Sequence, residues 1–180
     1  MVVRTLVILA ALGAAPSAFG QTPAAGGPVS QAIRDSWESA KKNITESAAQ
    51  MPEDGYAFKP VATVRTFGQI LAHVAGANYE FCSGARGEKS PHAEDEFEKS
   101  ATTKADIVKA LDASLAYCDA PVAALTDQTA AEVIDLPFGM PRGARAKILL
   151  LNTGHLNEHY GNLVTYFRVK GMVPPSSRGQ

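Results

Sequence analysis

Two histidines separated by one helical turn are the residues of this sequence best suited to chemistry. His155 and His159 lie in the segment from Gly154 to Gly161, and this spacing on an α-helix places both side chains on one face. Two imidazoles in this arrangement can bind a single metal ion. The alternative is a pair of core histidines that form hydrogen bonds to neighbouring groups, because unpaired ring nitrogens are costly to bury.

A third histidine favours the metal site over that alternative. Along the helix of the first two, a predicted apolar stripe consists of Ile148, Leu151, His155, His159, Leu163 and Tyr166, so both imidazoles should point inward. Upstream, His73 is surrounded by small residues that would let another helix come close: Ala72, Ala75, Gly76 and Ala77. Three histidines from two helices form a candidate metal site that leaves at least one coordination position for water or substrate.

Three other polar residues are candidates for roles at or near this site. Glu158, next to the last histidine, is a candidate catalytic base, with simple solvent exposure as the alternative. Asn152, three residues before His155, is a candidate hydrogen-bond partner for a metal-binding histidine, or a plain surface amide. His92 lies in a charged segment and is interpreted as a solvated residue rather than a ligand.

Four long helices are predicted to position these residues. Ser30 is the expected N-cap of the first, and Thr66 with Gln69 forms a capping box at the start of the second. No alternating strand pattern of any length occurs, so we predict an all-α four-helix bundle. Apolar residues recur at spacings of three and four over the expected helical ranges 30–51, 66–83, 103–125 and 144–170.

The connection between the second and third helices is long enough for them to run parallel. It extends from Gly84 to Thr102 and is polar and charged. An extended chain covers about 3.3 Å per residue, so roughly twenty residues can retrace a helix about 27 Å long. Some four-helix bundles contain such a crossover.

The only two cysteines, Cys82 and Cys118, bear on this topology. They lie at similar distances from the expected starts of their helices, Thr66 and Thr103. In parallel helices they would be level, whereas in antiparallel helices they would be on the order of 20 Å apart, beyond the limit of about 7 Å between disulfide Cα atoms. We predict a disulfide together with the parallel arrangement; the alternative is two free cysteines packed in the protein.

The N-terminal segment predicts export. Residues 1–20 combine a positive start, an apolar run and the small-residue end Ala18-Phe19-Gly20, which is typical of a cleaved signal peptide, with an uncleaved anchor as the alternative. We expect a flexible lead at 21–29, the bundle at 30–172 and a C-terminal tail at 173–180. A periplasmic or secreted location would favour the disulfide.

Charge and hydropathy exclude two classes of partner. The chain contains 17 Lys and Arg against 18 Asp and Glu, with no basic block, so a nucleic-acid partner is not expected. After removal of the signal no transmembrane run remains, so stable membrane insertion is not expected. A small-molecule substrate is the expected partner, and its identity is not encoded in any motif.

Three motifs in order resemble the DinB/YfiT-like superfamily of four-helix bundles. They are Met51-Pro52-Glu53 leading to Phe58-Lys59-Pro60; Thr66 to Val74; and His155 to Gly161, followed by Tyr166-Phe167-Arg168 and Gly171-Met172-Val173-Pro174-Pro175. The resemblance covers nearly the whole chain after residue 20. It implies up-down-down-up helix order, homodimers, and His73, His155 and His159 as ligands of a divalent metal ion, zinc or nickel.

The resemblance leaves two functions open. Some members of the family are thiol-dependent transferases or isomerases, but Tyr160 and Asn162 stand where many cytoplasmic members have Arg and Gln. Our first hypothesis is an exported metal-dependent hydrolase or transferase of unknown substrate. The second is a non-catalytic metal-binding or envelope stress-response bundle.

Overall fold

The computed structural model describes residues 26–179, so the predicted signal peptide and most of the lead lie outside the described residues. The long helices are α1 (Pro28–Gln50), α2 (Phe67–Arg86), α4 (Lys104–Ala123) and α6 (Arg145–Val169). The short elements are η1 (Glu53–Ala57), α3 (Glu96–Ser100), α5 (Asp127–Ala131), β1 (Val133–Ile134), β2 (Gly143–Ala144) and η2 (Pro175–Ser177). Within the described chain, no helix is both long and apolar enough to cross a bilayer.

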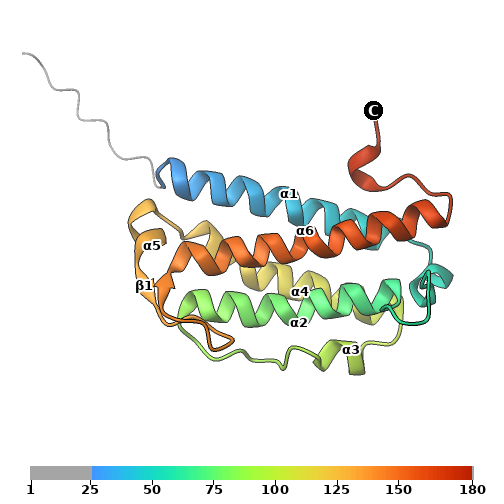
Figure 1. Ribbon diagram of the computed structural model, residues 1–180, viewed down its shortest axis with the longest axis horizontal. Helices are drawn as coiled ribbons and strands as arrows, with labels where there is room; N and C mark the ends of the chain where they lie inside the picture. The colour runs from blue at the N-terminus through green and yellow to red at the C-terminus, as the bar shows by residue number, and fades with distance from the viewer. Residues whose placement is uncertain (1–25, 180) are drawn as a thin grey trace, which may run out of the picture.

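The four long helices form a bundle with the predicted up-down-down-up order. In Figure 1, α1 and α6 run in one direction, and α2 and α4 run in the other. Each long helix packs against two others, because α2 and α1 both contact α4 and α6. The crossover segment, residues 87–103, returns along the outer side of α2 and carries α3 (Figure 1).

Two short features are absent from the sequence prediction. The crossover segment, for which no element was predicted, contains the five-residue helix α3. Before α6, strands β1 and β2 form an antiparallel pair in which Ile134 lies opposite Gly143. Elements this short contain too few residues to produce a periodic pattern.

The start of α1 differs from the prediction. The helix begins at Pro28, and its N-cap is Gly27 rather than Ser30, so the end of the expected flexible lead is helical. The carboxylate of Asp127, next to Thr126 at the start of α5, accepts hydrogen bonds from the backbone N–H groups of Ser30 at 2.7 Å and Val29 at 3.4 Å. The N–H groups in the first turn of a helix have no acceptor within that helix, and this carboxylate supplies one for them.

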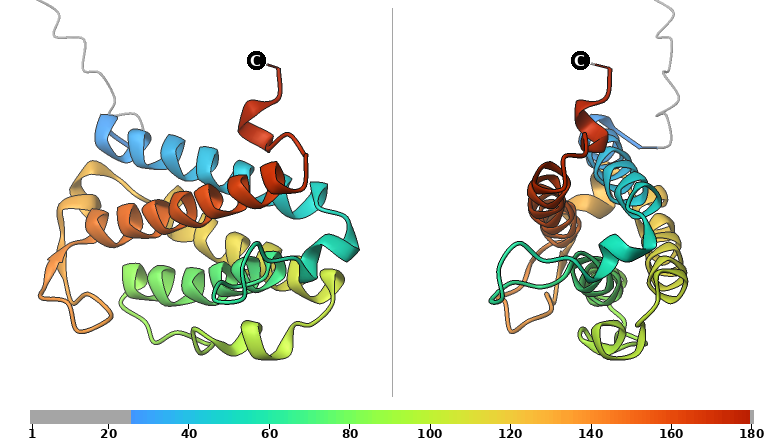
Figure 2. Two further views of the ribbon diagram at one scale, coloured as in Figure 1. Left: turned by 45° about the vertical axis from the view of Figure 1, so that its right-hand side comes forward. Right: turned by 90° about the vertical axis from the view of Figure 1, so that its right-hand side faces the viewer.

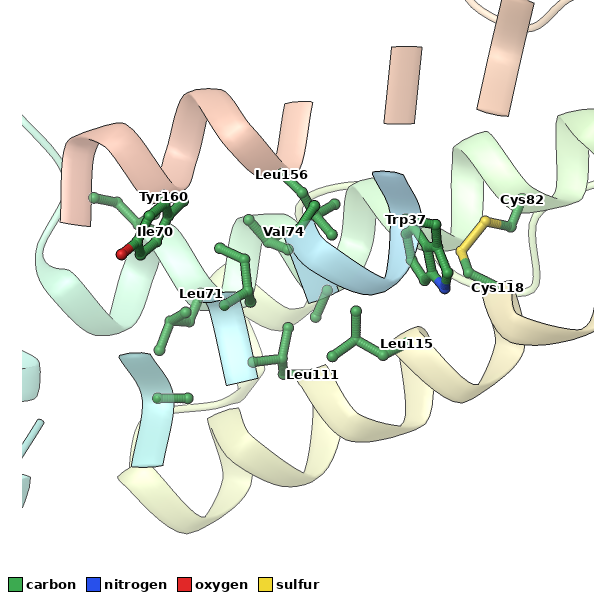
Figure 3. Close-up of a cluster of buried hydrophobic side chains, with 14 of the residues drawn as sticks. Trp37, Ile70, Leu71, Val74, Cys82, Leu111, Leu115, Cys118, Leu156 and Tyr160 are labelled. Carbon is green, nitrogen blue, oxygen red and sulfur yellow. A yellow bond between two sulfur atoms is a disulfide. The ribbon is translucent and has the colours of Figure 1, made fainter. Parts of the chain in front are cut away.

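The core lies between the four helices and draws on all of them. Trp37 of α1, Leu71 of α2, Leu111 of α4 and Leu156 of α6 are buried together (Figure 3). The predicted stripe on α6 is wrong at Leu151, which is 40% exposed. The buried face of α6 is therefore rotated away from this residue.

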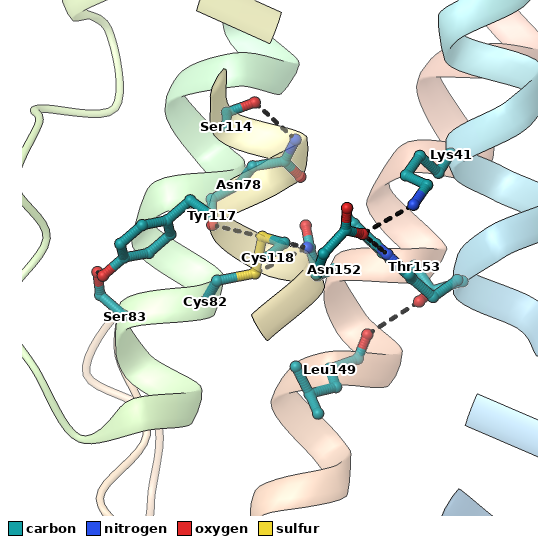
Figure 4. The surroundings of a disulfide bond; sticks show 12 residues. Lys41, Asn78, Cys82, Ser83, Ser114, Tyr117, Cys118, Leu149, Asn152 and Thr153 are labelled. Carbon is teal, nitrogen blue, oxygen red and sulfur yellow. Dashed lines mark hydrogen bonds and ion pairs between the residues drawn. A yellow bond between two sulfur atoms is a disulfide. The ribbon is translucent and has the colours of Figure 1, made fainter. Parts of the chain in front are cut away.

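The two cysteines lie at disulfide distance, as predicted. Cys82 of α2 and Cys118 of α4 are bonded, with their Cα atoms 5.3 Å apart, which requires the parallel arrangement of these helices. The side-chain amide of Asn152 points at the pair from α6 and donates to the two sulfurs at 3.4 and 3.5 Å (Figure 4). Three helices therefore meet at this bridge.

The C-terminal tail folds back onto the bundle through η2. The backbone N–H of Ser176 in η2 donates to the hydroxyl of Tyr160 at 2.8 Å, and the Gln50 amide donates to the carbonyl of Val173 at 2.8 Å. The tail thus packs against α1 and α6.

Candidate metal centre

The structure brings the three predicted histidines together in one cluster. His73 projects from α2, and His155 and His159 project from α6, a helix that packs against α2. The Nε2 atom of His155 lies 3.2 Å from Nε2 of His73 and 3.0 Å from Nε2 of His159. The one-turn spacing on α6 and the α2–α6 contact are thus sufficient to assemble the cluster.

The surroundings keep two of these imidazoles neutral. His73 and His159 are 8% and 7% exposed, and His155 is half-buried. Burial and the neighbouring rings of His159 and His73 lower the pKa of His155 from 6.5 to about 3. Burial, with the charge of His73, lowers the pKa of His159 to about 4. At neutral pH both rings are therefore in the form that binds metal ions.

A carboxylate from the crossover segment orients the third imidazole. Glu98 of α3 places Oε1 3.0 Å from Nδ1 of His73. A carboxylate only accepts hydrogen bonds, so Nδ1 carries the proton and Nε2 presents its lone pair to the cluster. Arg65 holds the same carboxylate with two contacts, from Nε at 2.9 Å and from Nη2 at 3.3 Å.

The path of the crossover segment places this carboxylate. The segment passes so close to α2 that a Cβ atom added at Gly76 would lie 1.9 Å from the carbonyl oxygen of Glu94. Phe97 packs on Tyr79 with ring centroids 5.9 Å apart, beside the histidine-bearing face. The small residues near His73 were expected to admit another helix, and at Gly76 they admit the crossover backbone instead.

The other predicted residues lie outside the cluster. Glu158 is exposed and forms no hydrogen bond to the three histidines within the described residues. Asn152 does not support His155, because its amide points at the disulfide. His92 bonds to Glu96 through Nδ1 at 2.9 Å and is not part of the cluster.

Sequence reasoning missed Glu98, the carboxylate that contacts the cluster. It belongs to an acidic stretch with Glu94, Asp95 and Glu96, and no spacing distinguishes it from these neighbours. Only the route of the crossover segment over Gly76 selects it. A capping or periodic pattern could not have indicated this contact.

The donor set fits one divalent metal ion. Nitrogens bound tetrahedrally at about 2.0–2.1 Å from one ion lie about 3.3 Å apart, close to the 3.2 and 3.0 Å separations between the Nε2 atoms. The lone pair that Glu98 leaves on Nε2 of His73 faces other ring nitrogens, an arrangement that one shared ion would satisfy. Three imidazole nitrogens suit a first-row transition metal ion better than magnesium or calcium.

A cavity gives access to the cluster from one side. It has a volume of about 580 Å³, and its lining includes Val64, Arg65, His159, Asn162 and Tyr166. The Asn162 amide nitrogen lies 3.5 Å from Nδ1 of His159. A ligand bound at the histidines would therefore meet the guanidinium of Arg65 and the amide of Asn162.

Solved structures with the same fold include several DinB-like proteins. One from Bacillus subtilis is 22% identical, with a TM-score of 0.62, and the match covers 79% of this chain and 93% of that one. Another from Bacillus cereus is 17% identical, with a TM-score of 0.63 and coverage of 81% and 95%. A mycothiol-dependent maleylpyruvate isomerase is 14% identical, with a TM-score of 0.62 and coverage of 76% and 61%.

The sequence itself also matches a family. None of the curated proteins matches this chain. The family model of the DinB superfamily matches residues 36–163, which include all three histidines and all four long helices in whole or in part. This protein is a member of the DinB superfamily.

Proposed function

We propose that this protein binds one zinc or nickel ion through His73, His155 and His159 and acts as an exported hydrolase or transferase on a small molecule. The observation that carries the proposal is the convergence of three Nε2 atoms beside a cavity of about 580 Å³. The fold shared with a mycothiol-dependent maleylpyruvate isomerase supports an enzymatic role.

The chain supplies binding and orientation at this centre. A divalent ion would contribute Lewis-acid polarisation of a ligand oxygen. Glu98 keeps the proton of His73 on Nδ1, which leaves Nε2 free for the ion. Arg65 forms an ion pair with Glu98 and also lies in the cavity wall. Its side chain is 45% exposed, so it would attract a polar or anionic group of the substrate.

A substrate screen tests catalysis. Ester, lactone, amide and thiol substrates should be assayed with zinc, with nickel and without added metal. We expect metal-dependent turnover that the His92→Ala variant retains, because His92 lies outside the cluster. Metal binding without turnover in any assay would reject the enzyme and leave the second hypothesis.

One observation favours that second hypothesis, a non-catalytic metal-binding or envelope stress-response bundle. Glu98 is engaged by both His73 and Arg65, and Glu158 is exposed. Within the described residues, no carboxylate is therefore hydrogen-bonded to the cluster and also free to accept a proton from a substrate. A catalytic role would have to rely on the ion itself or on a base brought by the substrate.

The Glu98–His73 contact predicts a strong effect on metal affinity. Glu98→Gln should weaken zinc binding by about 10- to 100-fold, because a neutral amide oxygen is a weaker acceptor for the Nδ1 proton of His73 than a carboxylate and makes the imidazole a weaker ligand. Competition with a chromophoric chelator measures the dissociation constant. Glu96→Gln is a matched control on the same helix, since Glu96 makes the same kind of bond to His92. Equal affinities of the two variants would contradict the role of Glu98.

Export and self-association are further parts of the proposal. The disulfide between Cys82 and Cys118 supports an oxidising compartment, the periplasm or the exterior. A homodimer rests on the family resemblance alone and stays a prediction.

A further inference from the structure

The backbone of Phe138 is strained for a residue of its type. Its φ of 59° is the one positive value among the non-glycine residues that the structure describes. A bulky side chain in the left-handed region is an outlier, because Cβ approaches the following carbonyl oxygen. The side chain is nevertheless 52% exposed, so the strain is not offset by full burial in the core. Strain of this kind at a half-exposed residue points to a function.

The ring of Phe138 is connected to the histidine cluster through one other aromatic side chain. Phe138 packs edge-to-face on Phe81 of α2, with centroids 5.1 Å apart. Phe81 in turn lies 5.5 Å from the ring of His155. Three rings therefore form a row that leads from the exposed loop to the candidate metal centre.

The loop that carries Phe138, residues 135–142, is anchored on both sides. Pro137 packs directly on Gly84 of α2, where an added Cβ atom would lie 2.8 Å from the proline ring. Met140 donates its backbone N–H to the Pro137 carbonyl at 3.2 Å, and Arg142 pairs with Asp135 at 2.9 Å. The phenyl ring of Phe138 is therefore held in a defined position.

This loop and the loop before α2, residues 58–66, lie on one side of the bundle (Figure 2). The right-hand view of Figure 2 shows loops 58–66 and 135–142 protruding on the same side of the bundle. Figure 1 places them at opposite ends of α2. Arg65 lies in the cavity wall at the end with loop 58–66, whereas the exposed ring of Phe138 belongs to the loop at the other end.

Leu151 is another exposed apolar side chain, and it belongs to the helix that carries His155. It lies one turn before His155 on α6, so the two side chains share a face of the helix. At 40% exposed it was the outlier in the predicted core stripe.

From these contacts we propose that Phe81 and Phe138 form an apolar wall, and that this wall selects ligands with an aryl or alkyl arm attached to a metal-binding head group. The inference rests on the proposed function, because the head group must bind at His73, His155 and His159. The arm would lie toward loop 135–142, and Arg65 in the cavity wall beside His159 would face any charged group. Phe138 is thus a specificity-determining residue, and its strained backbone is retained for ring placement.

The experiment uses two hydroxamates that differ only in the arm. Titration calorimetry on the zinc-loaded protein should show that 3-phenylpropionohydroxamate binds about tenfold tighter than acetohydroxamate. In Phe138→Ala this ratio should fall to about twofold, while acetohydroxamate affinity stays the same. Val133→Ala, which removes another exposed apolar side chain of the same hairpin, should keep the tenfold ratio.

Phe138→Asn separates ligand selection from folding. Asparagine tolerates the left-handed region, so the melting temperature should equal or exceed that of the parent protein while the tenfold preference is lost. Zinc-treated protein that contains no zinc by elemental analysis and binds neither hydroxamate would overturn the metal centre and this inference together. Binding of both, with the same ratio in Phe138→Ala as in the parent protein, would overturn the wall and leave the metal centre intact.

Discussion

Replacing His155 by alanine should abolish metal binding. His155 is the central member of the cluster, because its Nε2 atom is close to Nε2 of both His73 and His159. The parent protein, purified without a polyhistidine tag, should contain close to one zinc or nickel ion per chain by elemental analysis. Two remaining imidazoles leave an incomplete ligand set, so the variant should contain almost none.

The same substitution should remove the stabilisation that the ion provides. A ligand at about 100 times its dissociation constant stabilises the folded state by about 2.7 kcal/mol, and His155→Ala should lose that increment in melting experiments with added metal. Without metal the change should be smaller, because the buried Nδ1 of His155 has no hydrogen-bond partner to lose. His92→Ala is the matched control and should bind like the parent. Full metal content in His155→Ala would disprove the assignment.

Removal of the disulfide should produce the largest loss of stability. The bridge joins residues 36 positions apart, and closing a loop of that size stabilises the folded state by about 4 kcal/mol through the unfolded chain. The double variant Cys82→Ala/Cys118→Ala should therefore lose about 3–4 kcal/mol in urea unfolding. Asn152 would also lose the sulfur partners of its amide.

A reductant provides the control for this prediction. It should destabilise the parent protein by a similar amount and leave the double variant unchanged. Alkylation followed by intact-mass measurement checks the bond itself, and two alkylated cysteines in the unreduced, denatured protein would rule it out. Such a result would also remove the covalent support for parallel α2 and α4.

The local features of the fold were predictable because they depend on neighbouring residues. Thr66 and Gln69 form the expected capping box at the start of α2, and Thr103 caps α4 through the backbone N–H of Asp106 at 3.2 Å. Helical periodicity likewise placed His155 and His159 on one face. These patterns repeat within one or two turns, so a single sequence contains all the information they require.

The cluster and the disulfide were predictable for a further reason. Both follow from helix register once α2, α4 and α6 are assumed to pack in one bundle. The small residues around His73, and later the motifs that resemble the DinB family, added His73 to the histidine pair, and the level positions of Cys82 and Cys118 indicated parallel helices. Each residue of a helix lies at a fixed distance along the helix axis from its first residue, so contacts between packed helices can be estimated from residue numbers.

The contacts that complete the site were decided only by the tertiary structure. Glu98 reaches His73 because the crossover backbone touches α2 at Gly76, and Phe138 reaches Phe81 because Pro137 packs on Gly84. Glu98 and Phe138 lie outside the long helices, where no periodicity relates the place of a residue in the chain to the direction of its side chain. The sequence by itself determined which helices form and which faces carry the histidines, whereas the paths of the connecting segments determined which side chains surround them. Those paths depend on close backbone approaches between distant residues, and no local pattern encodes them.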